Sequence, residues 1–71
     1  MSDSIYKVIE LIGTSKDSWE KAAASAVERA SKTLRDLRVA EVVKLDMQLD
    51  ETGRVEAYRA KLNVSFKFDG S

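Results

Sequence analysis

The side chains of this chain that could do chemistry are carboxylates, amines, guanidinium groups and hydroxyls, because the sequence contains no Cys and no His. Their absence removes thiolate nucleophiles, most catalytic triads, the usual zinc sites and the one side chain that titrates near neutral pH. The Lys, Asp and Glu residues show no spacing that pairs a nucleophile with a base. We therefore predict that the chain is not an enzyme.

Two short segments come closest to a ligand site. Asp46, Asp50 and Glu51 are hard oxygen donors of the kind that calcium prefers, but no 12-residue calcium loop is present. Gly13–Lys16 has the order Gly-Thr-Ser-Lys but lacks the Gly-x-x-x-x-Gly-Lys-Ser/Thr pattern of a phosphate-binding loop. We interpret it as a turn that ends a strand and supplies hydroxyls to cap the next helix.

Length and charge narrow the class of protein. The 71 residues form a single domain, 1–71, and a domain this short buries only about 60% of its unfolded surface, so we expect self-association. The 12 basic and 12 acidic residues balance, which argues against nucleic acid or an anionic membrane as partner. No segment has the roughly 18 apolar residues of a membrane span, and no targeting segment is visible. We expect a cytoplasmic protein.

The elements that must position these side chains begin with a strand and a helix. Ile5–Ile12 is β-branched and apolar on both faces, which predicts a strand covered on two sides. From 17 to 37, apolar residues follow the i, i+3, i+4, i+7 spacing of an amphipathic helix, whose start is marked by Asp17 and Glu20 as a capping box. Trp19 lies on the apolar stripe, and we interpret it as a core or interface residue.

The second half predicts a hairpin. Val39–Leu49 alternates, with Val39, Glu41, Val43, Leu45, Met47 and Leu49 on one face and Ala40, Val42, Lys44, Asp46 and Gln48 on the other. A polar turn with Gly53 leads to a last strand, Val55–Phe68. The fold class is α+β in the order β-α-β-β. The strands are longer than the helix, so their apolar ends need cover from neighbouring subunits.

This order and several motifs together closely resemble the dodecins over nearly the whole chain. The motifs are Tyr6–Ser15 (YKVIELIGTS), Glu28–Ala30, Leu34-Arg35, Ala40–Val42 and Val64–Phe66. The resemblance implies a three-stranded antiparallel sheet wrapped around one long helix. It also implies a hollow homododecamer that binds and stores flavins between its subunits.

The resemblance also indicates where the flavin site is altered. Flavin-binding dodecins have a stacking Trp at the place of Val39 and a Gln that bonds the flavin edge at the place of Arg59. We therefore predict storage of riboflavin or FMN at a weakened site formed by Val39, Arg59, Gln48, Lys61 and Asp46. Arg59 either holds a phosphate or pairs with Asp46 or Gln48. The alternative is a calcium-binding shell, because a Trp-less branch of the family is associated with calcium.

Overall fold

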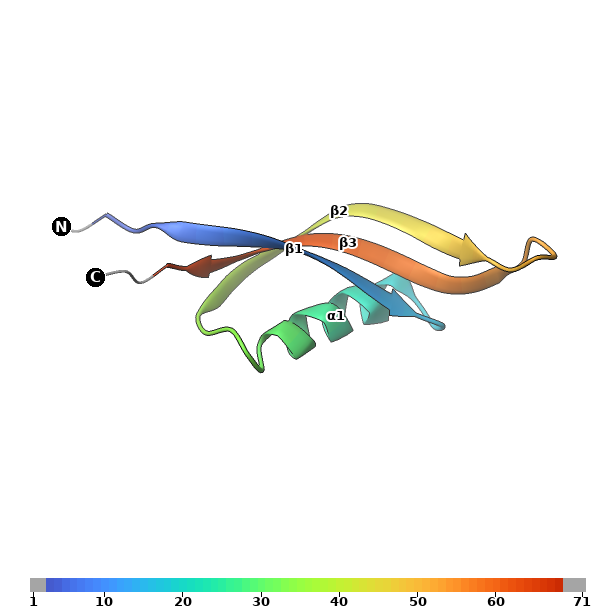
Figure 1. Cartoon of the computed structure of the whole chain (residues 1–71), viewed down its shortest axis with the longest axis horizontal. Coiled ribbons are helices and arrows are strands. Elements are labelled where there is room, and N and C mark those ends of the chain that lie inside the picture. The colour runs from blue at the N-terminus through green and yellow to red at the C-terminus, as the bar shows by residue number, and fades with distance from the viewer. Residues whose placement is uncertain (1–2, 69–71) are drawn as a thin grey trace.

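A three-stranded antiparallel sheet with one helix on one face forms the molecule (Figure 1). The computed structural model describes residues 3–68, so residues 1–2 and 69–71 of the predicted domain lie outside the described part. The elements in chain order are β1 (Tyr6–Ser15), α1 (Trp19–Ala30), β2 (Leu37–Leu49) and β3 (Val55–Lys67). β3 is the central strand, with β1 and β2 on its two sides. This confirms the predicted α+β class and element order.

Helix α1 begins one residue later than the capping box predicts. Ser18 is the N-cap, and its Oγ accepts a hydrogen bond from the Lys21 N–H at 3.1 Å. Asp17 instead forms an exposed ion pair with Lys21, whose Nζ lies 3.1 Å from the carboxylate. The prediction that Asp17 caps the helix is therefore wrong, and the hydroxyl next to it has that role.

The helix also ends earlier than its apolar spacing predicts, at Ala30 and not near residue 37. Ser31 Oγ donates to the Glu28 carbonyl at 2.7 Å, which satisfies one carbonyl of the last turn. Beyond this point, Asp36 adopts a positive φ of 60°, a conformation that no helix can include. Leu34 and Leu37 keep the helical spacing but belong to the connection and to β2.

Close contact between α1 and the sheet defines the core. Ala22 of α1 and Ala60, Leu62 and Val64 of β3 are fully buried. Gly13 lies within β1, since the strand continues to Ser15 and the turn begins later than the predicted 13–16. The predicted hydroxyl is present, because Ser15 Oγ accepts from the Asp17 and Ser18 N–H groups that lead into the helix. A Cβ at Gly13 would lie 2.0 Å from the Ala22 carbonyl oxygen, so only glycine permits this approach.

Two extra residues in β2 change which side chains share a face. The register against β3 shifts by one residue at Arg38 and again at Val43, as in β-bulges. The regular alternation predicted for β2 is therefore wrong across these points. Because paired residues of antiparallel strands point to the same side, the register divides β2 into a helix side and a helix-free side. The helix side has Leu37, Ala40, Val42, Leu45 and Met47, and the helix-free side has Val39, Glu41, Lys44, Asp46 and Gln48.

The β2–β3 hairpin closes as predicted. Gly53 has a φ of 84°, and the Asp50 N–H donates to the Arg54 carbonyl at 2.8 Å. Asp50 Oδ1 accepts from the Thr52 hydroxyl at 2.7 Å and from the Thr52 and Arg54 N–H groups. These bonds hold the pKa of Asp50 below its usual value, the Thr52 hydroxyl having the largest effect. The carboxylate named as an oxygen donor is thus engaged within its own turn.

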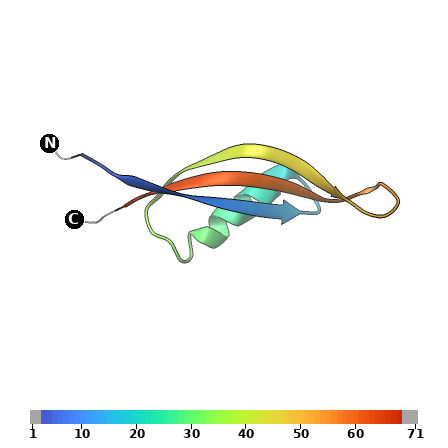
Figure 2. The ribbon, with the colours of Figure 1, turned by 45° about the horizontal axis from the view of Figure 1, so that its top comes forward.

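The sheet extends beyond the helix at both ends, as predicted from the strand lengths (Figures 1 and 2). The molecule measures 57 × 20 × 15 Å, whereas a 12-residue helix covers only about 18 Å. Within this chain β1 is covered on the helix side alone, because Tyr6, Val8 and Ile12 are exposed on the other. The prediction of cover on two sides is not met by one chain. The single helix within residues 3–68 has neither the length nor the apolar character needed to cross a membrane.

We predict that Gly13→Ala destabilises the fold by about 3 kcal/mol or more, since the new methyl group meets main-chain atoms that cannot rotate away. Denaturant unfolding of the variant measures the loss. Thr14→Ala, at the next and exposed position of β1, is the matched control. Equal unfolding midpoints for the two variants would contradict the close helix–sheet approach.

Candidate functional site

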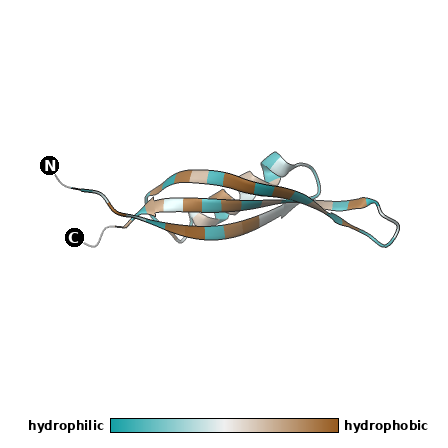
Figure 3. Cartoon of the chain, turned by 90° about the horizontal axis from the view of Figure 1, so that it is seen from above, coloured by the Kyte–Doolittle hydropathy of each residue, from teal (hydrophilic) through white to brown (hydrophobic). Residues whose placement is uncertain are grey.

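The five residues predicted from the sequence all lie on the helix-free face of the sheet, but not in one cluster: Val39 lies opposite Ser65, six residues of β3 or roughly 20 Å from the row of Arg59 and Asp46. Figure 3 looks down on the sheet from the side opposite α1 and shows polar and apolar residues alternating along the strands. The strand register forms cross-sheet rows on this face, with β3 residues in the middle. The rows are Val8–Ser65–Val39, Glu10–Asn63–Glu41, Ile12–Lys61–Lys44 and Thr14–Arg59–Asp46, with Gln48 opposite Ala57 at the hairpin end. Their contact with a ligand stays a prediction.

Arg59 and Asp46 form a two-point ion pair across β3 and β2. Arg59 Nε donates to Asp46 Oδ1 at 2.7 Å, and a terminal guanidinium nitrogen donates to Oδ2 at 3.0 Å. This hydrogen-bonded guanidinium is the main reason that the pKa of Asp46 lies below its usual value. Of the two partners within the sheet predicted for Arg59, Asp46 and Gln48, it is Asp46 that pairs with it.

Trp19 holds the main chain of Asp46 from the other side of the sheet. Its indole N–H donates to the Asp46 carbonyl at 3.0 Å. Its ring meets Tyr58, the residue before Arg59, edge to face with centroids 5.0 Å apart. Trp19 is partly buried, which agrees with the predicted core role. The first turn of α1 thereby fixes the strand segments that carry both partners of the ion pair.

The other predicted residues differ in what surrounds them. The side chain of Val39 is 60% exposed and offers an apolar surface without a ring for stacking. Lys61 pairs with Glu10 of β1, its Nζ lying 3.4 Å from Oε2. Gln48 donates to Glu56 Oε1 at 3.4 Å, near the end of the hairpin. The four polar residues of the predicted site, Arg59, Asp46, Lys61 and Gln48, each have a partner within the chain.

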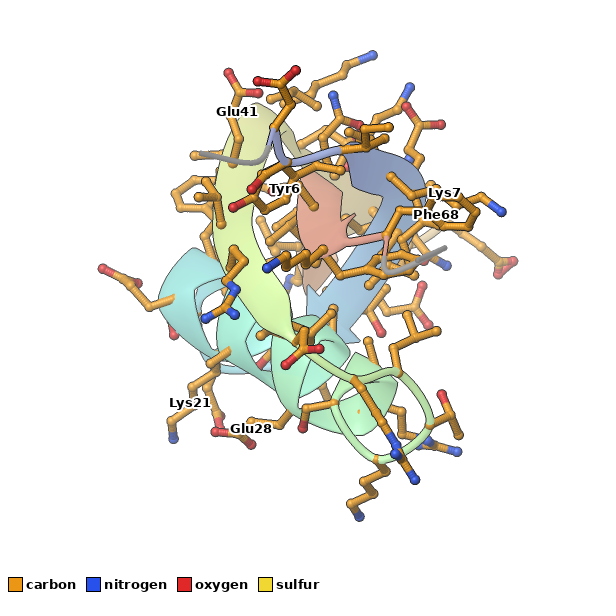
Figure 4. The ribbon with its side chains drawn as sticks, turned by 90° about the vertical axis from the view of Figure 1, so that its left-hand side faces the viewer. Tyr6, Lys7, Lys21, Glu28, Glu41 and Phe68 are labelled. Atoms are coloured by element: carbon orange, nitrogen blue, oxygen red, sulfur yellow. The ribbon has the colours of Figure 1, made fainter. Side chains whose placement is uncertain are left out.

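One row on this face contains oxygen donors that sequence analysis missed. Glu10, Asn63 and Glu41 lie side by side on β1, β3 and β2. Figure 4 shows Glu41 pointing away from α1, whereas Glu28 lies on the helix. These residues are far apart in sequence. The register shift at Val43 puts Glu41 on the same face as Asp46, whereas simple alternation would put the two on opposite faces. Within residues 3–68 no three acidic side chains are grouped closely enough to hold a metal. A complete calcium shell would require ligands from another subunit or water.

An apolar hollow lies on the opposite, helix side of the sheet. It measures about 490 Å³ and is lined by Trp19, Glu20, Ala23, Val42 and Leu45. It exists because α1 packs mainly on β1 and β3 and reaches β2 little. Val42, Leu45 and Met47 are each about half exposed there. Exposed apolar residues in one strip are typical of a surface that another chain covers.

We predict that Arg59→Gln raises the pKa of Asp46 towards the usual aspartate value, because the charged two-point donor is lost. Since the folded-state pKa is lowered, the pair stabilises the fold above about pH 4 and this stabilisation is lost as pH falls through the folded-state pKa. Carboxyl ¹³C NMR titration measures the change. Asp50 is the internal control and keeps its lowered pKa. An Asp46 pKa that does not move would contradict the assignment.

Comparison with known proteins gives one consistent family. The Dodecin family model matches residues 5–69. The calcium dodecin of Mycobacterium tuberculosis is 56% identical over 64 residues, 90% of this chain and 89% of that protein. Its crystal structure, described as that of a calcium-chelating antigen with a novel calcium-binding site, has a TM-score of 0.83 over 96% of both chains.

Two further dodecins agree with this assignment. The dodecin of Thermus thermophilus is 40% identical over 65 residues, 92% of this chain and 93% of that protein. The structure of dodecin from Streptomyces coelicolor covers both chains fully with a TM-score of 0.90 and 38% identity. The strand order, the single helix and the length of each match agree. The chain belongs to the dodecin family.

Proposed function

We propose that this chain forms a homododecamer that binds and stores a small ligand without chemical conversion, and that the ligand is calcium. Calcium is chosen over flavin because the helix-free face offers neither of two groups that would bind a flavin. It has no aromatic side chain at Val39, and its one guanidinium at the predicted flavin edge, Arg59, is occupied by Asp46.

Self-association is supported by what a single chain leaves uncovered. The helix side of β2 exposes an apolar strip, and both ends of the sheet extend beyond α1. In the part of the chain that the structure describes, β1 and β2 are edge strands with no neighbour on one side. Closed symmetric assembly covers such strips and edges together. Membership of the dodecin family supports twelve as the number of subunits.

Two observations favour calcium over flavin: the oxygen donors on the helix-free face and the name of one relative. Glu10, Asn63 and Glu41 supply carboxylate and amide oxygens in one cross-sheet row. The relative that is 56% identical is named calcium dodecin. One carboxylate of the row, Glu10, is shared with Lys61, so a cation must compete with an ammonium group for it. This favours weak, exchangeable binding, which suits storage.

Flavin is the second candidate, because the resemblance to the dodecins implies flavin binding. The relative from Thermus thermophilus is named dodecin, without mention of calcium. Loss of a stacking ring costs about 1–3 kcal/mol by analogy with base stacking, which is roughly a tenfold to hundredfold loss of affinity. Val39 cannot replace that interaction. Flavin binding at this face is therefore expected to be weak.

We predict that calcium raises the melting temperature of the purified protein and that a chelator reverses the rise, because a ligand bound only to the folded state stabilises it. Glu41→Gln should remove most of the effect. Glu28→Gln is the matched control, since Glu28 lies on the exposed side of the helix (Figure 4). No response to millimolar calcium, or equal responses of the two variants, would argue against calcium.

The flavin candidate has its own test in the double variant Val39→Trp, Arg59→Gln. Restoring a ring and an amide should strengthen riboflavin binding about tenfold to hundredfold if the surrounding face accepts the flavin ring. Quenching of flavin fluorescence during titration measures the affinity. The unchanged protein is the reference. Equal, unquenched fluorescence for both proteins would exclude a flavin pocket at this face.

A further inference from the structure

We infer that Asp46 is a specificity-determining residue that acts as an internal competitor for Arg59 and keeps anionic groups such as phosphate off the helix-free face. The inference rests on the proposed function in one respect, that this face holds the ligand. It adds the chemical class of the ligand: the face accepts uncharged or cationic ligands and rejects phosphorylated ones.

The geometry of the pair supports this role. A carboxylate and a phosphate bind a guanidinium through the same two parallel N–H donors. Asp46 occupies both positions, at 2.7 and 3.0 Å. The side chains are only partly covered, 41% exposed for Arg59 and 34% for Asp46, so solutes can reach them. An incoming anion must displace the carboxylate and would then lie beside its negative charge.

Both the main chain and the side chain of Asp46 are held by neighbouring residues. Trp19 binds its carbonyl oxygen, Arg59 binds its carboxylate, and the cross-strand register sets the two side chains directly opposite each other. Trp19 is also held against Tyr58, the neighbour of Arg59. The Asp46 carboxylate is ionised at neutral pH, as an ordinary aspartate is, and Arg59 lowers its pKa further.

The other cations on this face are Lys61, Lys44 and Lys67, the last lying at the far end of β3 opposite Tyr6, and none has the two parallel donors of a guanidinium. Lys61 is paired with Glu10 at 3.4 Å. Lys44 lies two residues before Asp46 on β2, where its charge also lowers the pKa of that carboxyl, but its single ammonium group lacks those two parallel donors. On the other side of Arg59 in its row is the uncharged Thr14. Removal of the Asp46 charge would therefore free one guanidinium with a fork-shaped set of donors.

The test uses inorganic phosphate as the probe and the Arg59 Nε–H resonance in ¹⁵N NMR as the readout. Asp46→Asn should bind phosphate at Arg59 about tenfold or more tightly than the unchanged protein. Asp17→Asn, which removes an aspartate from the ion pair with Lys21, is the matched control and should leave the Arg59 response unchanged. Asp46→Ala is a second variant in case the amide disturbs the strand.

The result that would overturn the inference is equal phosphate binding at Arg59 with and without the Asp46 charge, whether strong or absent. A parallel titration compares riboflavin with FMN, which differ by a phosphate. Asp46→Asn should increase affinity for FMN about tenfold relative to riboflavin. If neither flavin binds any variant, the flavin candidate fails, whereas the phosphate titration still decides the role of Asp46.

Discussion

The close approach of α1 to β1 at Gly13 is the constraint on which the rest of the structure depends. Because Gly13 has no side chain, the Ala22 main chain lies against the strand and Ala22 is fully buried. A helix held so near to β1 and β3 cannot also cover β2. The core of one chain is consequently small, and the apolar strip on β2 is left for another subunit.

The same placement of the helix organises the opposite face. Trp19, in the first turn of α1, reaches past the edge of the core to the Asp46 carbonyl. The shifts at Arg38 and Val43 turn Val39 and Glu41 to the helix-free side together with Asp46. The packing that builds the fold therefore also positions the Asp46–Arg59 pair. Assembly and ligand choice follow from one arrangement of helix and strands.

The strands and the hairpin could be predicted because alternation and a glycine turn are local signals. Gly53 adopts the positive φ that its place in the sequence indicated. The end of the helix could not be predicted, since Leu34 and Leu37 keep the helical spacing although the helix ends at Ala30. The Ser31 hydroxyl bonds to the last turn, and the left-handed backbone of Asp36 excludes a continuous helix as far as Leu37. The face on which Val39 and Glu41 lie could not be predicted either, because the bulge at Val43 falls among apolar residues and has no recognisable sequence pattern.

Native mass spectrometry of the freshly purified protein tests the central claim most directly, since it reports the number of subunits and any retained ligand together. We expect a twelve-subunit species that carries no phosphorylated cofactor, that binds calcium when calcium is added, and that loses the metal after treatment with a chelator. A stable monomer, or an assembly that retains stoichiometric FMN, would contradict it.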